Sequence, residues 1–132
     1  GKNDSVKELS ALATFIYQEL GAEVPLTFSV ENARQHGEIT STHCLFLARK
    51  IAKECGLNYV YSSNAKDSDA SSTFCPSCEA LLIERENLQI KQLELAKDGK
   101  CPHCHQKIAG HFGALAKKKK LVQRFPIQII RR

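Results

Sequence analysis

Two Cys-x-x-Cys pairs constrain the fold of this chain more than any other feature. They are Cys75-Pro76-Ser77-Cys78 and Cys101-Pro102-His103-Cys104, separated by residues 79–100. Each pair presents two thiols from one tight turn, which the Pro after the first Cys helps to preset. Four such thiolates form a tetrahedral site that suits zinc, with Zn–S distances of about 2.3 Å, or a single iron. Because the spacing is close to that of four-cysteine zinc ribbons, we expect a metal bound by these four residues. The predicted ligands are Cys75, Cys78, Cys101 and Cys104.

Alternative interpretations of the cysteines and their neighbours stay open. A redox dithiol accounts for one Cys-x-x-Cys but not for two at ribbon spacing, and iron in place of zinc would make a rubredoxin-like electron carrier. Cys44 and Cys55 lie outside the pairs and favour a reducing, cytoplasmic setting, where we expect them buried on one helix face. His103 and His105 flank Cys104 and could each replace a cysteine ligand. With four cysteines already present, we expect both imidazoles to be exposed.

Residues 1–62 predict the helix–strand–helix–strand order of a parallel α/β sheet. Ser5 and Glu8 match a capping box, apolar residues follow at helical spacing, and Gly21 ends the first helix. The next strand, helix and strand are expected over residues 24–30, 42–55 and 57–61. Two parallel strands are not a stable sheet alone. We therefore expect an upstream segment, or self-association, to supply further strands.

The second half of the chain predicts a small metal-dependent hairpin. Residues 63–73 are small and polar and predict a linker. Residues 74–112 predict a knuckle, a hairpin and a second knuckle, with a tight turn at 97–100 before the second cysteine pair. The hairpin strands are expected over residues 80–84 and 88–95. Such a segment is too small for a sufficient core, so the metal would supply much of its folding free energy.

The charge of the chain is concentrated at its C-terminal end. The formal net charge is +5, and the tail 113–132 contains the run Lys117–Lys120 together with three arginines. A basic tail can bind nucleic acid or an acidic protein partner, although such runs are more often only solvated. No apolar run is long enough to span a bilayer, so we expect no membrane partner. The chain has no Met and begins with Gly1, so we expect it to be processed or cut from a longer protein.

Several segments carry a family resemblance that covers residues 1–112. The Gly1-Lys2-Asn3-Asp4-Ser5 segment and residues 52–61 resemble a late helix and the final helix-to-strand step of radical S-adenosylmethionine (radical SAM) enzymes related to pyruvate formate-lyase activating enzyme. The cysteine pairs, with Leu81-Leu82-Ile83-Glu84-Arg85 after the first pair and Ile108-Ala109-Gly110 after the second, are similar to the C-terminal cysteine-rich extension of the AmmeMemoRadiSam subgroup.

This resemblance implies an α/β fold: the last βα units of a partial β/α barrel, followed by a zinc-ribbon-like β-hairpin extension. Four protein thiolates would close the coordination sphere of the metal, so we expect a structural site that caps the barrel or docks a partner protein. Radical chemistry in the family needs a [4Fe–4S] cluster on a Cys-x-x-x-Cys-x-x-Cys loop together with S-adenosylmethionine, and no cysteines of this chain have that spacing. Activity and both of those cofactors would belong to a longer parent protein, so no catalytic residue is expected here.

The sequence departs from the family pattern after each cysteine pair. The Gly that usually follows each cysteine pair is replaced by Glu79 and His105, at a position where a positive φ would favour Gly.

The rival function is a stand-alone zinc-ribbon binding module whose basic tail, 113–132, binds nucleic acid or an acidic protein.

Overall fold

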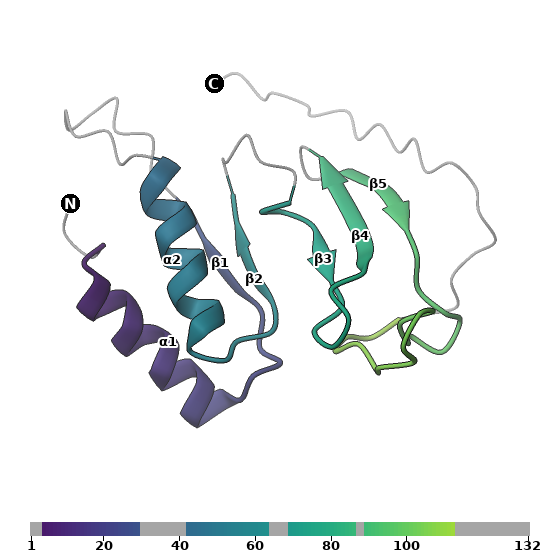
Figure 1. Cartoon of the computed structure of the whole chain (residues 1–132), viewed down its shortest axis with the longest axis horizontal. Helices are drawn as coiled ribbons and strands as arrows, with labels where there is room; N and C mark the ends of the chain where they lie inside the picture. Colours follow the sequence, from purple (N-terminus) through teal and green to yellow (C-terminus); the bar gives the residue numbers. More distant parts are fainter. Residues whose placement is uncertain (1–3, 30–41, 64–68, 87–88, 113–132) are drawn as a thin grey trace, which may run out of the picture.

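A computed structural model describes residues 4–29, 42–63, 69–86 and 89–112 of the chain (Figure 1). The elements are α1 (Val6–Leu20), β1 (Leu26–Phe28), α2 (Thr42–Glu54), β2 (Val60–Ser62), β3 (Thr73–Phe74), β4 (Leu81–Glu86) and β5 (Gln89–Leu93). Strands β1 and β2 form a parallel pair, and β3, β4 and β5 form an antiparallel sheet in that order. In Figure 1 the helices lie at one end, the β3–β5 sheet lies at the other, and the parallel pair lies between them.

Helix α1 has the predicted capping box at its N-terminus. The N–H of Glu8 donates to the Ser5 hydroxyl oxygen at 3.3 Å, and the Glu8 carboxylate accepts from the Ser5 N–H at 3.4 Å. Gly21 ends the helix with a φ of 92°, a conformation that favours glycine. The residues of α1 that are buried are Leu9, Ala13 and Ile16.

Strands β1 and β2 run parallel, as predicted, and α2 connects them as the helix of a βαβ unit. Each strand is three residues long, shorter than the spans 24–30 and 57–61 that the sequence suggested. The helices pack on one face of the pair, in a core of Ala13, Ile16, Ala52, Leu57 and Val60. Thr27 and Tyr61 are opposite one another in the register and lie on the other face, since strand side chains alternate.

Residues 63 and 69–73, the part of the expected linker 63–73 that the structure describes, pack against neighbouring segments. Ala70, Ser72 and Thr73 are buried, and Thr73 begins β3. The N–H of Ser62 donates to the Ala70 carbonyl at 2.8 Å. Small side chains let this segment pack closely against β2, and its polar groups are hydrogen-bonded rather than solvated. Residues 64–68 of the expected linker lie outside the described residues.

Arg49 of α2 fixes the same segment from the helical side. Its Nε donates to the Val60 carbonyl at 3.0 Å and its Nη2 donates to the Asp69 carbonyl at 3.0 Å. One side chain therefore joins α2, the end of β2 and the approach to β3.

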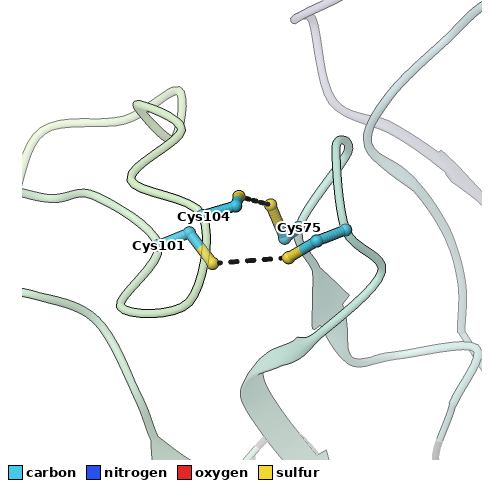
Figure 2. A group of neighbouring side chains, drawn as sticks. Cys75, Cys101 and Cys104 are labelled. Carbon is cyan, nitrogen blue, oxygen red and sulfur yellow. Dashed lines mark hydrogen bonds between the residues drawn. The ribbon is translucent and has the colours of Figure 1, made fainter.

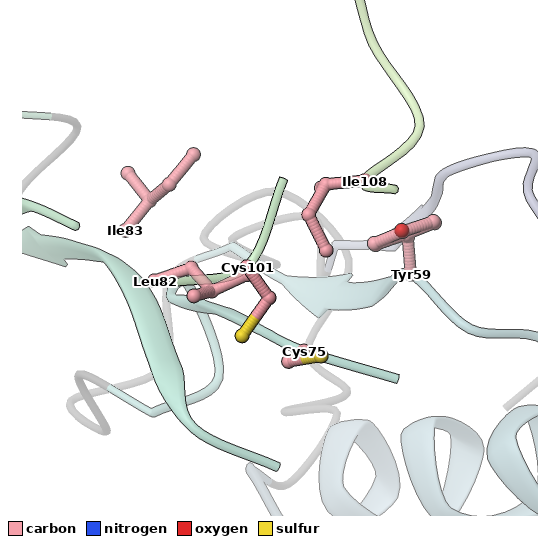
Figure 3. Packing of buried hydrophobic residues seen from close by; sticks show 6 residues of the cluster. All are labelled: Tyr59, Cys75, Leu82, Ile83, Cys101 and Ile108. Atoms are coloured by element: carbon pink, nitrogen blue, oxygen red, sulfur yellow. The ribbon is translucent and has the colours of Figure 1, made fainter. Parts of the chain in front are cut away.

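The second sheet has a separate hydrophobic core, and Tyr59 from the first half of the chain is part of it. The buried members are Tyr59, Cys75, Leu82, Ile83, Cys101 and Ile108 (Figure 3). The Tyr59 hydroxyl accepts the N–H of Ala109 at 3.1 Å, across fifty positions of sequence. The cysteine-rich segment is thus packed onto the α/β unit. The hairpin strands are offset from the predicted spans, because β4 continues through Arg85 to Glu86.

Candidate metal centre

The structure brings Cys75, Cys78, Cys101 and Cys104 together, with all four sulfurs within 4.8 Å of one another. Figure 2 shows Cys101 and Cys104, on one loop, facing Cys75 on the other. The Sγ atoms of Cys75 and Cys104 are 3.5 Å apart, and those of Cys78 and Cys101 are 3.7 Å apart. A tetrahedron with metal–sulfur distances of about 2.3 Å has sulfur–sulfur edges of about 3.8 Å. A disulfide would need about 2.05 Å. The cluster therefore has the dimensions of a four-thiolate metal site.

The two knuckles repeat one hydrogen-bond pattern. In the first, the Cys75 carbonyl accepts the Glu79 N–H at 2.9 Å, and the Cys75 N–H donates to the Ala80 carbonyl at 2.9 Å. In the second, the Cys101 carbonyl accepts the His105 N–H at 3.0 Å. The Cys101 N–H completes the repeat by donating to the Gln106 carbonyl at 2.9 Å. Each turn is thus closed by the backbone, which points its two thiols the same way.

The knuckles are placed by the sheet and by the turn after β5. Cys75 directly follows β3, and the first knuckle leads into β4. The turn before the second knuckle contains Gly99, whose φ is 76° and whose Cα faces the Phe112 ring so closely that a Cβ would meet it at 2.5 Å. An antiparallel bridge between Lys100 and Lys107 brackets the second knuckle. The hairpin therefore brings the second cysteine pair next to the first.

Within each pair, the first cysteine belongs to the core and the second to the surface. Cys75 and Cys101 are 1% and 0% exposed, whereas Cys78 and Cys104 are exposed. The site therefore has a buried half that contacts Leu82 and Ile108 and an outer half that solvent reaches. Such an arrangement ties a metal to the core while leaving a path by which it enters.

The thiols of the cluster differ in acidity. Burial raises the pKa of Cys101, but the N–H groups of Cys104 and His103 and the neighbouring thiols outweigh it and lower the pKa to about 6. The Ala80 N–H lowers the pKa of Cys78, but the thiol of Cys104 and burial outweigh it and raise the pKa to about 12. One thiolate is therefore present near neutral pH to attract a cation.

The other sulfur and imidazole side chains lie apart from the cluster. His103 and His105 are exposed. Cys44, in α2, and Cys55, just after α2, are half-buried rather than buried as expected, and the Thr14 hydroxyl lies 3.9 Å from the Cys55 sulfur. His36, an isolated histidine outside the cysteine pairs, lies outside the described residues.

Sequence reasoning missed Tyr59, which lies in the same buried cluster as Cys75 and Cys101 and accepts a hydrogen bond from the backbone beyond the second knuckle. The sequence predicts Tyr59 inside a strand over residues 57–61, whereas in the structure Tyr59 precedes β2. An aromatic residue with a hydroxyl at a strand entry is the kind of signal that marks such a bridge, because a buried Tyr hydroxyl needs a hydrogen-bond partner.

The chemistry of the cluster is that of a closed site. The described residues place four protein sulfurs around one centre, and these are sufficient for a metal ion with tetrahedral coordination. Such a site has no open position for water or substrate. Neither α1 nor α2 has the length and apolar character that would let a described helix cross a membrane.

The sequence was compared with those of known proteins, and it is similar to one that is named as uncharacterized. The chain is similar to a protein of Methanocaldococcus jannaschii named "Uncharacterized protein MJ0808", with 38% identity over 114 residues. The match covers 80% of this chain and 33% of the relative, so the chain spans about a third of the length of the curated relative. No family model matches the chain. No solved structure matches it either.

Proposed function

We propose that the four-cysteine cluster is a structural zinc site. The observation that carries the proposal is the pair of sulfur–sulfur separations, 3.5 and 3.7 Å, in a cluster of four cysteines. Zinc is favoured because Zn²⁺ is redox-inactive and its d¹⁰ shell imposes no geometry, so it binds readily to four thiolates in a tetrahedron. Its role is to hold the two knuckles together and to fix the hairpin against Tyr59 and the α/β unit.

Elemental analysis together with the visible spectrum of the purified chain tests the metal. About one zinc per chain and no colour is the expected result. One iron with thiolate charge-transfer bands and a reversible one-electron couple would replace this function with rubredoxin-like electron transfer. Four titratable thiols with no metal, even after incubation with zinc, would refute the site.

The α/β unit is, in this proposal, the end of a larger domain: the last βα units of a radical SAM barrel of the AmmeMemoRadiSam type. The parallel pair β1–β2, with α2 between its strands, supports the larger domain because a βαβ unit needs more strands beside it. The exposed side chains of Leu12 and Phe15 on α1 support it too, since a preceding element would cover them. The relative is about three times as long as the matched span, so a similar protein contains further chain beyond that span.

In that parent, the radical chemistry lies upstream and the zinc site caps the barrel or docks a partner protein. The test is the natural gene that encodes this segment. Its product should contain a Cys-x-x-x-Cys-x-x-Cys loop and, after reconstitution with iron and sulfide, cleave S-adenosylmethionine reductively. The 132-residue chain alone should do neither. If the protein encoded by the natural gene lacks that loop, the proposed radical SAM activity is wrong, whereas the proposed zinc site is unaffected.

The rival function is a stand-alone zinc-ribbon module whose tail, residues 113–132, binds nucleic acid or an acidic protein. It predicts binding to a nucleic acid duplex that weakens steeply with salt and disappears when residues 117–132 are removed. Absence of binding at low salt would dispose of it.

A further inference from the structure

A groove of about 770 Å³ lies between the helix-free face of the β1–β2 pair and the β3–β4 ribbon. That volume falls within the range of small-molecule sites, roughly 300–1,000 Å³. Its walls combine hydroxyl groups with apolar and aromatic surface. The residues that matter below are Thr27, Tyr61, Ser63, Thr73, Arg85 and Ile108.

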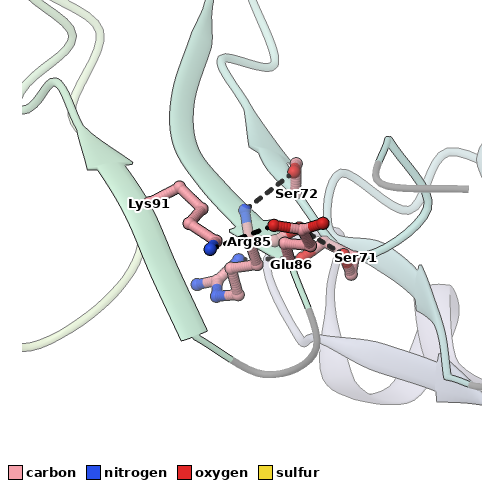
Figure 4. A network of polar contacts seen from close by, with 5 residues as sticks. All are labelled: Ser71, Ser72, Arg85, Glu86 and Lys91. Atoms are coloured by element: carbon pink, nitrogen blue, oxygen red, sulfur yellow. Dashed lines mark hydrogen bonds and ion pairs between the residues drawn. The ribbon is translucent and has the colours of Figure 1, made fainter. Parts of the chain in front are cut away.

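Arg85 is held in a fixed orientation on the wall of this groove. Its Nη1 donates to the Ser71 carbonyl at 3.1 Å and to the Thr73 hydroxyl at 2.8 Å. The guanidinium carbon lies 5.8 Å from the centre of the Tyr61 ring, and the Tyr61 and Thr73 hydroxyls are 3.0 Å apart. The backbone of Arg85 is held as well, because its N–H donates to the Ser72 hydroxyl at 3.1 Å (Figure 4). The side chain is therefore preorganised.

The remaining donors of Arg85 are arranged for an oxyanion. Within the described part of the chain, its Nε and Nη2 make no hydrogen bond. These two N–H groups lie on one edge of the planar guanidinium, the geometry that binds a carboxylate or a phosphate through two parallel hydrogen bonds. Because Nη1 is already bound to the protein, this edge is the part of the cation left for a ligand.

The charge of Arg85 is not balanced locally. Among the described residues the ion pairs join Lys50 with Glu54, Lys91 with Glu86, and Lys100 with Asp98. Figure 4 shows Glu86, the neighbour of Arg85, directed to Lys91. Glu23 also lines the groove but forms no ion pair with Arg85. A half-buried cation without a counter-charge attracts an anion more strongly than an exposed one, since water screens it less.

We infer that this groove binds a small organic anion, a carboxylate or a phosphate ester with an apolar body. Arg85 grips the oxyanion through Nε and Nη2. Thr73 and Tyr61 position Arg85, and Ile108 with the Phe112 ring offers surface to the apolar body. The site lies outside the cysteine cluster and does not depend on the proposed function.

Nuclear magnetic resonance titration of the zinc-loaded, full chain tests this inference with three probes: benzoate, phenyl phosphate and inorganic phosphate. Saturable shifts at Tyr61, Ser63 and Thr73 are expected with the aromatic probes. Tighter binding of benzoate assigns a carboxylate ligand, and tighter binding of phenyl phosphate assigns a phosphate ester. Inorganic phosphate binding as tightly as phenyl phosphate would overturn the apolar part of the inference.

Variants separate the groove from general charge attraction. Arg85→Gln should weaken binding about tenfold or more, the scale of a charge-assisted hydrogen-bonded pair. Lys91→Gln removes the same charge from β5, outside the groove, and should leave binding unchanged. Equal effects of the two variants, or shifts that rise linearly with probe concentration, would overturn the site.

A second variant leaves Arg85 and its hydrogen bonds intact, in case Arg85→Gln disturbs the fold. Thr27→Glu places a carboxylate on the opposite wall from an exposed position in β1. It should weaken binding of every anionic probe, whereas Thr27→Gln, of similar size but neutral, should not. Unchanged binding in Thr27→Glu would show that the probes bind elsewhere.

Discussion

Glu79 and His105 occupy the same backbone position in the two knuckles of the metal centre. Each follows the second cysteine of its pair, and each has a positive φ, 58° for Glu79 and 62° for His105. Each also donates its N–H to the carbonyl of the first cysteine, at 2.9 and 3.0 Å. The left-handed conformation costs a residue with a Cβ roughly 1–2 kcal/mol. The knuckles therefore carry backbone strain at two matched points.

Replacing either residue by Gly should stabilise the zinc-loaded chain. Relief of the left-handed conformation outweighs the extra freedom that Gly gives the unfolded chain, so a net gain of about 0.5–1 kcal/mol per site is expected. Urea unfolding of Glu79→Gly and His105→Gly measures it. Glu79→Ala and His105→Ala remove the same side chains without relieving φ, and they should show no gain. Equal stability of the Gly and Ala variants would contradict the strain argument.

Cys78→Ser or Cys101→Ser should release the metal and unfold residues 74–112. Structural zinc sites contribute about 10–16 kcal/mol in total, so the loss of one of four ligands should weaken binding by ~100-fold or more. Metal stoichiometry and circular dichroism report the two effects, and α1 should remain partly formed. Cys44→Ser changes a cysteine outside the cluster and should keep the metal. Full metal content in both cluster variants would refute the four-thiolate site.

The sequence predicted best what depends on neighbours along the chain. The Ser5–Glu8 capping box, the glycine at the end of α1, and the parallel order of the first two strands follow from local signals and are observed. The approach of the two cysteine pairs is also local in origin, because a hairpin of fixed length joins them. The barrel itself remains a prediction.

The sequence failed where long-range contacts decide the structure. Composition predicted a linker over residues 63–73, yet Thr73 begins a strand and Ala70 is buried, since β2 and Arg49 supply partners that composition cannot reveal. The Tyr59 contact with Ala109 and the placement of Arg85 over Tyr61 depend in the same way on how the two halves pack. No spacing rule encodes these contacts.

The metal-free chain should show one thiol that ionises near pH 6. The N–H groups of Cys104 and His103, together with neighbouring thiols, lower the pKa of Cys101 to about 6 although burial opposes them. Thiolate absorbance in the ultraviolet should therefore rise by one equivalent as pH increases through 6, and Cys101→Ser should abolish that step. Because protons compete with the metal for thiolates, zinc affinity should fall as pH is lowered. A first ionisation near pH 9 in the wild-type chain would contradict the prediction.

Tyr59→Phe should uncouple the hairpin from the α/β unit. The substitution removes the acceptor of the Ala109 N–H while keeping the aromatic ring in the core, at an expected cost of about 1–2 kcal/mol. Urea unfolding of the zinc-loaded chain, followed separately by helix content and by metal release, should change from one transition to two. Tyr17→Phe removes a hydroxyl from a side chain that is 47% exposed and serves as the control. A single transition at unchanged urea concentration would show that the two parts are joined by other contacts.

The uncovered flank of α1 should drive self-association when the chain is studied alone. Tyr17 lies on the flank toward α2, with its ring against Gly56, whereas Leu12 and Phe15 are 45% and 59% exposed on the other flank. Apolar surface of this kind marks an interaction site. Light scattering should therefore detect dimers or larger species, and Phe15→Lys should shift them toward monomer. Gln18→Lys adds the same charge on the exposed side of α1 and should not. A monodisperse wild-type monomer would contradict both this prediction and the proposal that upstream strands are missing.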